Sequence, residues 1–577
     1  MNILPKVKEF ESISGEVNIT GINWVFCDGI DERLIKAANK ISKSNEHGIS
    51  AFINAGNSDS EAYRLVIGKD KIEISSEGAA GAFYALQSLG ELLKNSDGKI
   101  KCCEINDSPD MKYRGFYHDV TRGKVPTLET LKKLVDTMVR YKMNSLQLYI
   151  EHTYEFKEYE FCLKEFGYLT KEEIRELDVY CTENFVELVP SLSTFGHLFQ
   201  LLSNDKYKHL CELANYEPED HYWIERMLHH TINPVKKESF ELIKSLIDQH
   251  VEAFTSDKFN ICCDETFDLG NGVEHDVDKG TLYLDFVNKI IGYLKSKGKK
   301  VMMWGDVVLE HPDRIGELPE DVIFLNWDYS PKPNPDRCKA FVGRRQIVCP
   351  GTNSWSALNE DIEIEEKNIG LLAQNGYKTG AFGLLNTNWG DHGNIASIEM
   401  AAYGLICGAA VSWNKDTMLD RAFRKEASLS YYGDEDLVDI LAELSPIRTA
   451  SSWRRQIYYH SDREGGNGDK NIRMYKADLK RRDYEKVIEK CKDIAEKVKN
   501  RAFYNEDVRH EMLLAICGTA LFAKWNAGII GEKIECFINF EQWKTEYKNA
   551  WMRKNKESEL KEILRVFDCC EQRTNNI

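Results

Sequence analysis

The stretch Phe259–Phe267, FNICCDETF in one-letter code, is an uncharged run that stops abruptly at two adjacent carboxylates, Asp264 and Glu265. The absence of charge up to Cys263 is typical of a strand that is covered on both faces. Glycines at positions 270 and 272 indicate that the chain then leaves the strand for a loop. In parallel α/β proteins ligands bind at this end of the strands. An Asp-Glu pair usually lies on the solvated surface, so the surrounding sequence must decide whether this pair is a surface feature or part of a binding site.

Similar short apolar runs alternate with helical stretches on both sides of this segment. The runs lie at Tyr113–Asp119, Asn144–Ile150, Val186–Leu192, Phe259–Cys263, Lys300–Trp304, Val322–Trp327, Gln346–Pro350 and Thr379–Leu385. Eight alternations predict an α/β fold of the (β/α)8 TIM barrel class. A doubly wound open sheet is the competing fold. It would show fewer strands and a glycine-rich phosphate turn, which does not follow the first run.

The sequence predicts three domains along the chain. Residues 1–108 read as a small α/β domain, because a hairpin pattern at Tyr63–Ile74 precedes a helical pattern at Ala79–Leu93. Residues 109–415 form the predicted catalytic barrel. Residues 416–577 lack strand patterns and contain the amphipathic stretches Met474–Arg501, Val508–Ala527 and Phe540–Phe567. We expect this last region to be a helical C-terminal domain that could supply a homodimer contact.

Composition limits the partners and the cellular location of the chain. The formal net charge of -17 over 577 residues argues against nucleic acid and against an anionic membrane surface as partners. The N-terminus shows no signal peptide, and the weakly polar run Met400–Trp413 is shorter than the roughly 20 residues of a membrane span. The 16 cysteines include no C-x-x-C pair, which fits a reducing compartment and no zinc site. We therefore expect a cytoplasmic protein with a neutral substrate.

The ends of the predicted strands carry the residue types of a sugar-binding site. Tryptophan follows four successive strands, and these four belong to a total of only 11 in the chain. Aromatic faces stack on the C–H faces of sugar rings, while planar polar groups bind the hydroxyls. The polar and aromatic residues at the strand ends are His118, Asp119, Arg122, Glu151, His152, His197, Asp264, Glu265, Trp304, Asp306, Trp327, Asp328, Tyr329, Trp355, Trp389, Asp391 and His392.

In combination, these motifs resemble glycoside hydrolase family 20, the β-N-acetylhexosaminidases, and the likeness spans Met1 to Trp413. Asp264-Glu265 resembles the catalytic pair of the family, and Phe195-Gly196-His197 resembles its T-P-G-H segment. Arg114-Gly115 resembles the arginine that grips the sugar O3 and O4. Trp304 resembles an indole that walls the acetamido pocket, and Trp389-Gly390-Asp391 resembles W-G-E, whose acid meets the O4/O6 edge.

Several positions depart from the family pattern. The usual H-x-G-G-D-E is Asn260–Glu265 here, so the histidine and both glycines are replaced. The H-W-H-x-x-D-D segment after the second strand is absent, and Glu151 is our choice for the acid that partners His197. Trp355 is followed by serine instead of the usual tyrosine, so we expect Tyr329 to hold the acetamido oxygen. These changes concern the subfamily and its fine specificity.

The resemblance implies an exo-acting, retaining hydrolase of terminal β-GlcNAc or β-GalNAc in which the substrate's own acetamido oxygen is the nucleophile. Glu265 would be the general acid and then base, which requires a raised pKa, and Asp264 would orient the acetamido group. The implied sugar contacts are Arg114, Asp391, Trp304, Trp327, Trp355 and Trp389. For Arg122 and Asp119, an ion pair at the barrel mouth and a substrate contact are equally supported. No metal or organic cofactor is implied.

Two alternatives remain open at this point. A retaining β-glycosidase with a protein nucleophile would place a carboxylate such as Asp306 or Asp328 about 5–5.5 Å from Glu265. A non-catalytic glycan-binding barrel would keep the aromatic pocket without the chemistry. The sequence argues against the second, because both acids are still present.

Overall fold

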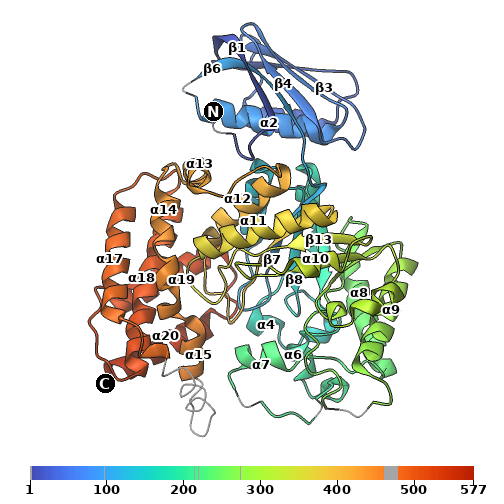
Figure 1. The fold of residues 1–577 in the computed structure, drawn as a ribbon, viewed down its shortest axis with the longest axis vertical. Helices are drawn as coiled ribbons and strands as arrows, with labels where there is room; N and C mark the ends of the chain where they lie inside the picture. The colour runs from blue at the N-terminus through green and yellow to red at the C-terminus, as the bar shows by residue number, and fades with distance from the viewer. Residues whose placement is uncertain are drawn as a thin grey trace.

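The computed structural model describes residues 3–96, 98–213, 215–218, 220–272, 275–460 and 478–576. An N-terminal sheet with two helices lies at one end, a strand barrel surrounded by helices follows, and C-terminal helices pack along the side of the barrel (Figure 1). The fold class predicted from the sequence is therefore confirmed.

The N-terminal part is a six-stranded sheet in the order β1-β6-β4-β5-β3-β2. The predicted hairpin is present, because β4 and β5 pair antiparallel through Ile67 and Ile72. Helix α2 packs on this sheet through its apolar side. The bounds of the elements are β1 (Glu9–Asn18), β2 (Ile22–Phe26), α1 (Glu32–Ile41), β3 (Ile49–Ala55), β4 (Tyr63–Ile67), β5 (Lys71–Ser76), α2 (Ala79–Lys94) and β6 (Lys99–Asp107).

Eight parallel strands close into a barrel in the order β10-β11-β12-β13-β14-β7-β8-β9. They are β7 (Tyr113–Asp119), β8 (Ser145–Ile150), β9 (Glu187–Leu192), β10 (Lys258–Asn260), β11 (Lys300–Trp304), β12 (Ile323–Trp327), β13 (Arg345–Cys349) and β14 (Gly383–Asn388). Two strands differ from the prediction by more than one residue at an end. β10 ends three residues early because Cys262 and Cys263 are left-handed, with φ of 56° and 64°. β14 starts late because the preceding helix continues to Thr379.

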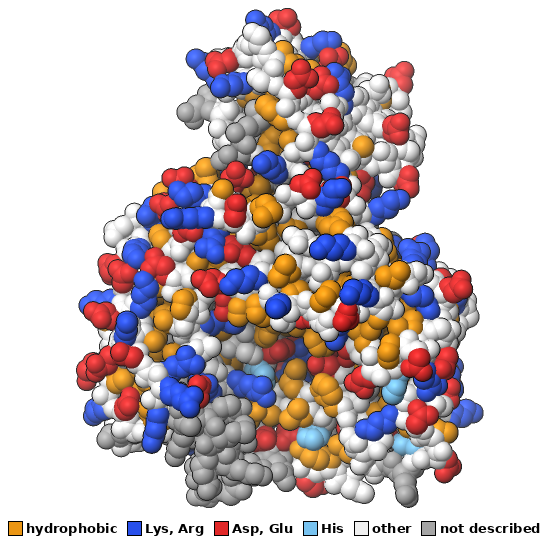
Figure 2. Space-filling view, in the orientation of Figure 1, with side chains coloured by type: hydrophobic (Ala, Val, Ile, Leu, Met, Phe, Trp, Pro, Cys, Tyr) orange, Lys and Arg blue, Asp and Glu red, His pale blue; other side chains and the backbone are white. Residues whose placement is uncertain are grey.

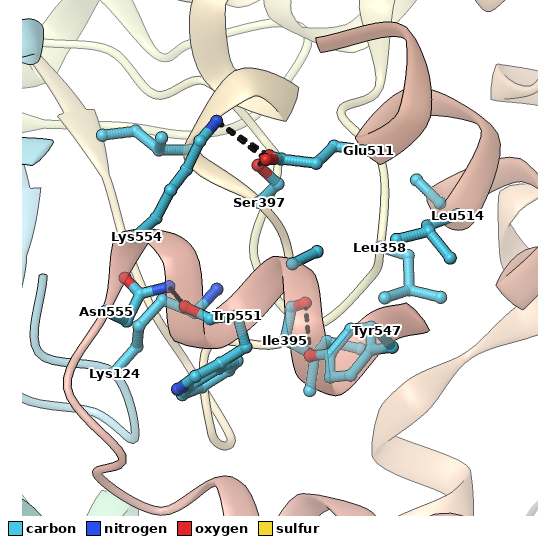
Figure 3. A pocket seen from close by; sticks show the side chains of 13 residues that line it. Lys124, Leu358, Ile395, Ser397, Glu511, Leu514, Tyr547, Trp551, Lys554 and Asn555 are labelled. Carbon is cyan, nitrogen blue, oxygen red and sulfur yellow. Dashed lines mark hydrogen bonds and ion pairs between the residues drawn. The ribbon is translucent and has the colours of Figure 1, made fainter. Parts of the chain in front are cut away.

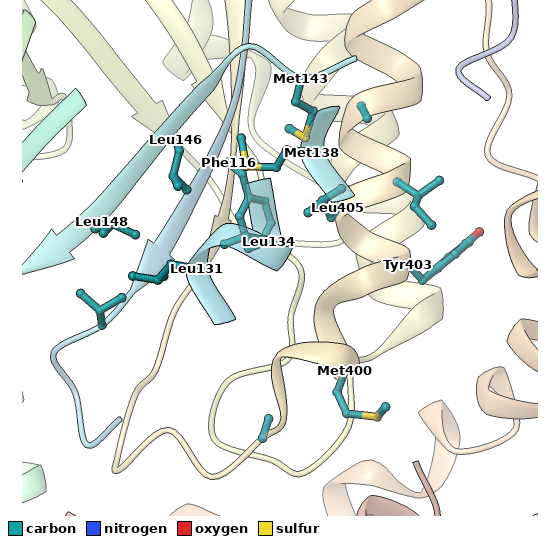
Figure 4. Packing of buried hydrophobic residues seen from close by; sticks show 14 of the residues in the cluster. Phe116, Leu131, Leu134, Met138, Met143, Leu146, Leu148, Met400, Tyr403 and Leu405 are labelled. Atoms are coloured by element: carbon teal, nitrogen blue, oxygen red, sulfur yellow. The ribbon is translucent and has the colours of Figure 1, made fainter. Parts of the chain in front are cut away.

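Strand alternation sends side chains to two separate cores. On β7, Tyr113 and Tyr117 point into the barrel, where they join Tyr149, Trp304 and Trp389 in an aromatic interior. Phe116, between them, points outward and packs against the covering helices α3 and α12, as Figure 4 shows with Leu134 and Leu405. The barrel is thus filled by side chains and is not a pore.

The barrel helices and helical turns are α3 (Leu128–Arg140), η1 (Lys157–Tyr159), α4 (Leu163–Phe166), α5 (Lys171–Glu183), α6 (Phe199–Leu202), η2 (Lys208–Leu210), α7 (Tyr222–Leu228), α8 (Lys237–Val251), α9 (Lys279–Ser296), η3 (Val308–Glu310), η4 (Pro312–Glu317), α10 (Pro335–Lys339), α11 (Ile362–Thr379), η5 (Ile398–Ala401) and α12 (Ala402–Trp413). Amphipathic faces hold the longer ones against the strands. In α3, for example, Leu131, Leu134 and Met138 recur at helical spacing and are buried.

The C-terminal region is helical, as predicted. Its elements are α13 (Arg421–Tyr432), α14 (Leu437–Ala442), η6 (Ser445–Ser451), α15 (Trp453–His460), α17 (Tyr484–Lys499), α18 (Glu506–Ile529), α19 (Phe540–Lys554) and α20 (Leu560–Asn575). The first residues of the predicted helix Met474–Arg501, up to position 477, lie outside the described residues. Helix α18 is long and apolar enough to cross a bilayer, but 83% of its apolar window is buried inside the protein. It therefore serves as a core helix, and it is longer than the run Met400–Trp413 singled out in the sequence.

The segment Lys554–Glu559, between α19 and α20, runs beside the loop that follows β7. Thr127 donates its backbone N–H to the carbonyl of Lys554 at 2.9 Å, and Lys556 donates to the carbonyl of Val125 at 2.9 Å. An antiparallel bridge joins Pro126 to Asn555 between these two bonds. We call this contact the C-terminal clamp. It fixes the first loop of the barrel mouth from outside the barrel.

Candidate active site

A cavity of about 140 Å³ opens at the carboxyl ends of the barrel strands. Seven of the eleven site residues predicted from the sequence line it. The full lining is Arg122, Met227, Asp264, Glu265, Trp327, Tyr329, Trp355, Trp389 and Asp391. The structure therefore brings together residues from the ends of β7, β10, β12 and β14, from the loop beyond β13 and, in Met227, from α7.

Asp264 and Glu265 both face this cavity because the chain turns sharply after β10. Strict strand alternation would point neighbouring side chains apart. Three of the four residues from Cys262 to Glu265 have positive φ, and Glu265 itself has a φ of 49°. Its backbone N–H donates to Asp306 Oδ2 at 3.0 Å, which holds the turn. Glu265 thus lies past the strand end, as the sequence argument requires.

His197 lies between the two acids. Its Nε2 is 3.4 Å from Asp264 Oδ2 and 3.3 Å from Glu265 Oε2. The His197 backbone donates to His230 Nδ1 at 2.8 Å, and the two imidazole rings stack with centroids 4.4 Å apart. Glycine at position 196 lets the backbone before His197 lie close to Asp264, because a Cβ there would be 2.6 Å from the backbone oxygen of Asp264.

The close contacts at this site shift the pKa values of His197 and Glu265. Burial alone would lower the pKa of His197, but Asp264 and Glu265 raise it to about 10. Burial alone would raise the pKa of Glu265, but the His197 contact holds it below its usual value. The predicted raised pKa of Glu265 is therefore wrong for the protein without a bound sugar. The proton of the pair resides on His197.

Arg122, from the loop after β7, is the arginine of the cavity. Its guanidinium is buried and donates to Asp391 Oδ1 at 2.9 Å and to Glu151 Oε1 at 3.3 Å. It also lies over the ring of Trp389, 5.1 Å from the centroid. The ion pair with Asp119 expected from the sequence is present at 3.8 Å. Arg122 also lines the cavity, so its contact with a substrate stays a prediction.

Arg114 does not reach the cavity, and its predicted role as the sugar-binding arginine is wrong. It is the second residue of β7, near the opposite end of the barrel, and its side chain is 0% exposed. The guanidinium donates to Glu61, in the loop before β4, at 2.7 and 2.9 Å and to the Tyr84 hydroxyl of α2 at 3.0 Å. Arg114 therefore joins the barrel to the N-terminal domain.

Glu151 is buried beside the site but does not contact His197 directly. It accepts hydrogen bonds from the Tyr149 hydroxyl at 2.9 Å and from Arg122. Arg122 Nη2 in turn lies 3.3 Å from His197 Nδ1. Despite burial, contacts with His152 and Arg122 lower the pKa of Glu151, so it is an anion. The predicted direct partnership between Glu151 and His197 is wrong, and Arg122 stands between them.

Aromatic residues form one wall of the cavity. Tyr329 stacks on Trp327 with centroids 5.1 Å apart and meets Trp355 edge-on at 5.2 Å. Trp389 donates its indole N–H to the Tyr329 hydroxyl at 2.7 Å, so this hydroxyl can still donate its own proton. Trp304 is different. It is 0% exposed, does not line the cavity and supports Trp389 from inside the barrel, which contradicts its predicted contact with the sugar.

Neither alternative protein nucleophile faces Glu265 across the cavity. Asp306 is half-buried and accepts the backbone N–H of Glu265, and desolvation together with the nearby charge of Asp264 raises its pKa to about 7. Asp328 accepts the backbone N–H groups of Ser330 and Asn334 and orders the loop after β12. Neither residue lines the cavity.

Sequence reasoning missed Met227 and His230. Met227 lines the cavity from α7, a short helix in the long segment between β9 and β10 for which the sequence shows no strand-end signal. His230 supports His197 from the same segment. A second, largely apolar cavity of about 40 Å³ lies between the barrel and the C-terminal helices, lined by Lys124, Tyr547 and Trp551 among others (Figure 3). It shares no lining residue with the first cavity.

Two family models match the chain. The model described as glycosyl hydrolase family 20, catalytic domain, matches residues 111–355, and the model for domain 2 of the same family matches residues 1–108. A beta-hexosaminidase of Vibrio vulnificus is 24% identical over 378 residues, which cover 53% of this chain and 44% of the relative. Hexosaminidase D of Bos taurus is 28% identical over 173 residues, or 27% of this chain and 46% of the relative. The chain thus spans about half the length of these curated relatives.

Solved structures share the fold. A chitobiase from Flavobacterium johnsoniae matches with a TM-score of 0.62 at 16% identity and covers 98% of this chain and 99% of its own. A beta-N-acetylhexosaminidase from Bacteroides fragilis matches with a TM-score of 0.58 at 20% identity and covers 72% and 91%. At these identities the likeness shows the architecture, including the helical C-terminal region in the first case.

Proposed function

Because this chain belongs to glycoside hydrolase family 20, we propose that it removes terminal, non-reducing β-linked N-acetylhexosamine residues from a glycan or glycoconjugate. One observation carries the proposal. Asp264 and Glu265 face the cavity from the same side, and the remaining carboxylate among its described lining residues, Asp391, is paired with Arg122. A retaining reaction in this cavity therefore lacks a protein nucleophile, and the substrate's 2-acetamido oxygen takes that part.

The first step breaks the glycosidic bond. Glu265 gives a proton to the leaving oxygen while the acetamido oxygen attacks C1, which forms a bicyclic oxazolinium ion. Asp264 accepts a hydrogen bond from the acetamido N–H and stabilises the positive charge. In the second step Glu265 takes a proton from water as that water attacks C1, and the product keeps the β configuration.

His197 supplies the proton that Glu265 needs for this cycle. The carboxylate of Glu265 is ionised before sugar binds, and His197 Nε2 lies 3.3 Å from its Oε2. A sugar ring that fills the cavity removes water from Glu265, which favours the neutral acid. The proton then moves from the imidazole to the carboxylate, and the protonated acid is formed in the bound complex.

The rest of the cavity suits the non-reducing end of a sugar chain. Asp391 and Arg122 offer a charged acceptor and donors for ring hydroxyls. Trp327, Trp355 and Trp389 offer aromatic faces, and the Tyr329 hydroxyl can donate to the acetamido oxygen. This arrangement supports an exo-acting mode.

Aryl β-glycosides of GlcNAc, GalNAc and glucose test the proposal directly. We expect hydrolysis of the two acetamido sugars and little of the glucoside, which lacks the internal nucleophile. Glu265→Gln should lower kcat by about 10²–10⁴-fold on an unactivated disaccharide, the usual range for a general acid. Glu238→Gln, an exposed acid paired with His209, is the matched control. Equal rates on the glucoside would exclude substrate assistance, and an active Glu265→Gln would exclude the acid assignment.

We also propose a cytoplasmic location and a homodimer, each with its own check. All 16 cysteines lie within the described residues and none is in a disulfide, which supports a reducing compartment. Acidic and basic side chains are interspersed on the face in view in Figure 2, which supports the expectation that nucleic acid and membranes are not partners. Subcellular fractionation tests the location. Light scattering coupled to gel filtration measures the molar mass in solution and so tests the homodimer.

A further inference from the structure

We propose that His197, Asp264 and Glu265 form a binding site for a zinc ion, which inhibits the protein when it binds. The ligand atoms of these three residues all lie within 4.8 Å of one another. The ion would be an inhibitor and not a cofactor, because it occupies the groups that the reaction needs. The inhibitory effect rests on the proposed function, whereas the binding itself does not.

The distances fit the coordination geometry of zinc. Zinc binds imidazole nitrogen and carboxylate oxygen at about 2.0–2.2 Å with tetrahedral angles, so its ligand atoms lie about 3.3–3.5 Å apart. His197 Nε2 is 3.4 Å from Asp264 Oδ2 and 3.3 Å from Glu265 Oε2. The two distances from the imidazole nitrogen to the carboxylate oxygens therefore already match the ligand–ligand distances of a tetrahedral zinc site. A water molecule would complete the fourth position.

The nitrogen that points at this position lacks an aligned hydrogen bond. His197 is buried, and neither its Nε2 nor Asp264 Oδ1 has a hydrogen-bond partner among the described residues. Buried polar atoms are nearly always satisfied, so a buried imidazole nitrogen that lacks a hydrogen bond and lies 3.3–3.4 Å from two carboxylate oxygens marks a place for another atom. Backbone contacts hold both sides, because His197 is fixed through His230 and Glu265 through Asp306.

The donor set selects the kind of ion and limits its affinity. One imidazole and two carboxylates suit zinc and cobalt better than magnesium or calcium, which prefer all-oxygen sites. Arg122 lies 3.3 Å from His197 Nδ1, and its positive charge opposes a second cation nearby. We therefore expect a dissociation constant in the micromolar range, weaker than at a structural zinc site.

Cobalt(II) titration of the full-length, chelator-treated protein tests the binding. We expect a visible d–d absorption band that saturates at one ion per chain, without the near-ultraviolet band of a cobalt–thiolate bond, and its loss when zinc is added. His197→Asn should weaken binding by at least about tenfold, the lower range of effects at metal sites. Asparagine is chosen because His197 has a φ of 57°, which asparagine tolerates. Asp264→Asn provides a second ligand variant, and the exposed His209→Gln is the control that should bind like wild type.

Unchanged cobalt binding in both ligand variants, or a thiolate band in the wild type, would overturn the proposal. Circular dichroism and melting temperature establish that each variant is folded. In activity assays zinc should raise the apparent KM for an aryl β-GlcNAc substrate without changing kcat, EDTA should reverse this, and magnesium should have no effect. If the wild type binds cobalt but hydrolyses no acetamido sugar, the proposed function fails alone. If it hydrolyses the sugar and binds no cobalt, the zinc site fails alone.

Discussion

Arg114 and Arg122 are separated by eight positions, and strand geometry explains why only one of the two side chains reaches the cavity. Arg114 is near the start of β7 and points outward, whereas Arg122 follows the end of the strand and turns toward the mouth. Barrel enzymes take their active residues from the ends of strands. That rule, applied strictly to the sequence, would have favoured Arg122, since the motif likeness at Arg114 lies at the wrong end of the strand.

Lysine substitutions separate the two arginines. Arg122→Lys loses the planar donors that hold Asp391 and Glu151, so kcat/KM for an aryl β-GlcNAc should fall by at least about 100-fold, roughly 2.7 kcal/mol. Arg114→Lys should lower the melting temperature but leave KM unchanged, because the Arg114 guanidinium contacts Glu61, Tyr84, Trp413 and backbone carbonyls, all away from the cavity. Steady-state kinetics and thermal melts measure both. A larger kinetic loss in Arg114→Lys than in Arg122→Lys would contradict this assignment.

Single residues at the site could be predicted where a short-range motif places them. The acid pair and His197 are next to strand ends in sequence, and the structure brings them within 3.4 Å. Trp304 could not be placed correctly, because the last residue of β11 faces either the mouth or the interior depending on register. The ionisation of Glu265 could not be read from sequence either, since it depends on the distance to His197.

At the scale of elements, β10 is the least regular strand of the barrel. It spans only Lys258–Asn260, and the chain then passes through two left-handed cysteines where the family pattern has glycines. Left-handed backbone costs a residue with a Cβ about 1–2 kcal/mol. Asn260 offsets part of this, because its side chain accepts the backbone N–H of Cys262 at 3.0 Å and donates to Gln147 at 2.9 Å.

A pair of substitutions at Cys263 measures the strain. Cys263→Ala and Cys263→Gly both remove the thiol, which contacts Thr194 at 3.3 Å. Because φ is 64°, glycine should be the more stable of the two by about 1 kcal/mol, the reverse of the order in a helix. Thermal melts of the two variants give the comparison. An alanine variant that melts higher would show that the turn carries no such strain.

Periodicity predicts the existence of elements better than their ends. All eight barrel strands were found from apolar runs, yet the end of β10 and the start of β14 were misplaced. In both cases the residues are apolar or neutral, so the apolar pattern does not mark where the strand ends or starts. The left-handed backbone at Cys262 and Cys263 ends β10 and directs Asp264 and Glu265 toward the cavity. Helix α11 extends to Thr379 and ends at the left-handed Gly380, which delays the start of β14.

At the scale of the whole molecule, the C-terminal helices cover a buried lysine from the barrel. Lys124, two residues after Arg122, donates to the carbonyl of Ala396, and its ammonium lies 4.5 Å from the ring centroid of Trp551 (Figure 3). Burial lowers the pKa of Lys124 to about 7. The folded protein therefore binds fewer protons than the unfolded chain between pH 7 and the ordinary lysine pKa of 10.5.

The stability contribution of this lysine depends on pH in a defined direction. Below pH 7 Lys124 is charged in both the folded and the unfolded protein, so the folded state bears the full free-energy cost of burying the ammonium. This cost falls as the pH rises above 7. From pH 7 to 9 the wild type should gain roughly 2–3 kcal/mol relative to Lys124→Met, at about 1.4 kcal/mol per pH unit. Thermal melts of both proteins at pH 7 and 9 measure the difference. Parallel pH profiles would mean that Lys124 titrates normally.

The C-terminal clamp bears on how this protein can be divided for expression. The matched catalytic model ends at residue 355, and the barrel ends at Trp413, so a fragment cut there looks like a complete module. Yet Val125 and Thr127, just beyond Arg122, are paired with Lys556 and Lys554, and Glu559 bonds Arg226 and Trp223 in α7, next to Met227. The end of the chain thus holds residues that are next to the cavity lining, although it contributes no lining residue itself. The smallest fragment that keeps these supporting contacts is therefore close to the full polypeptide. A barrel expressed alone, or transferred alone into another protein, would lack them.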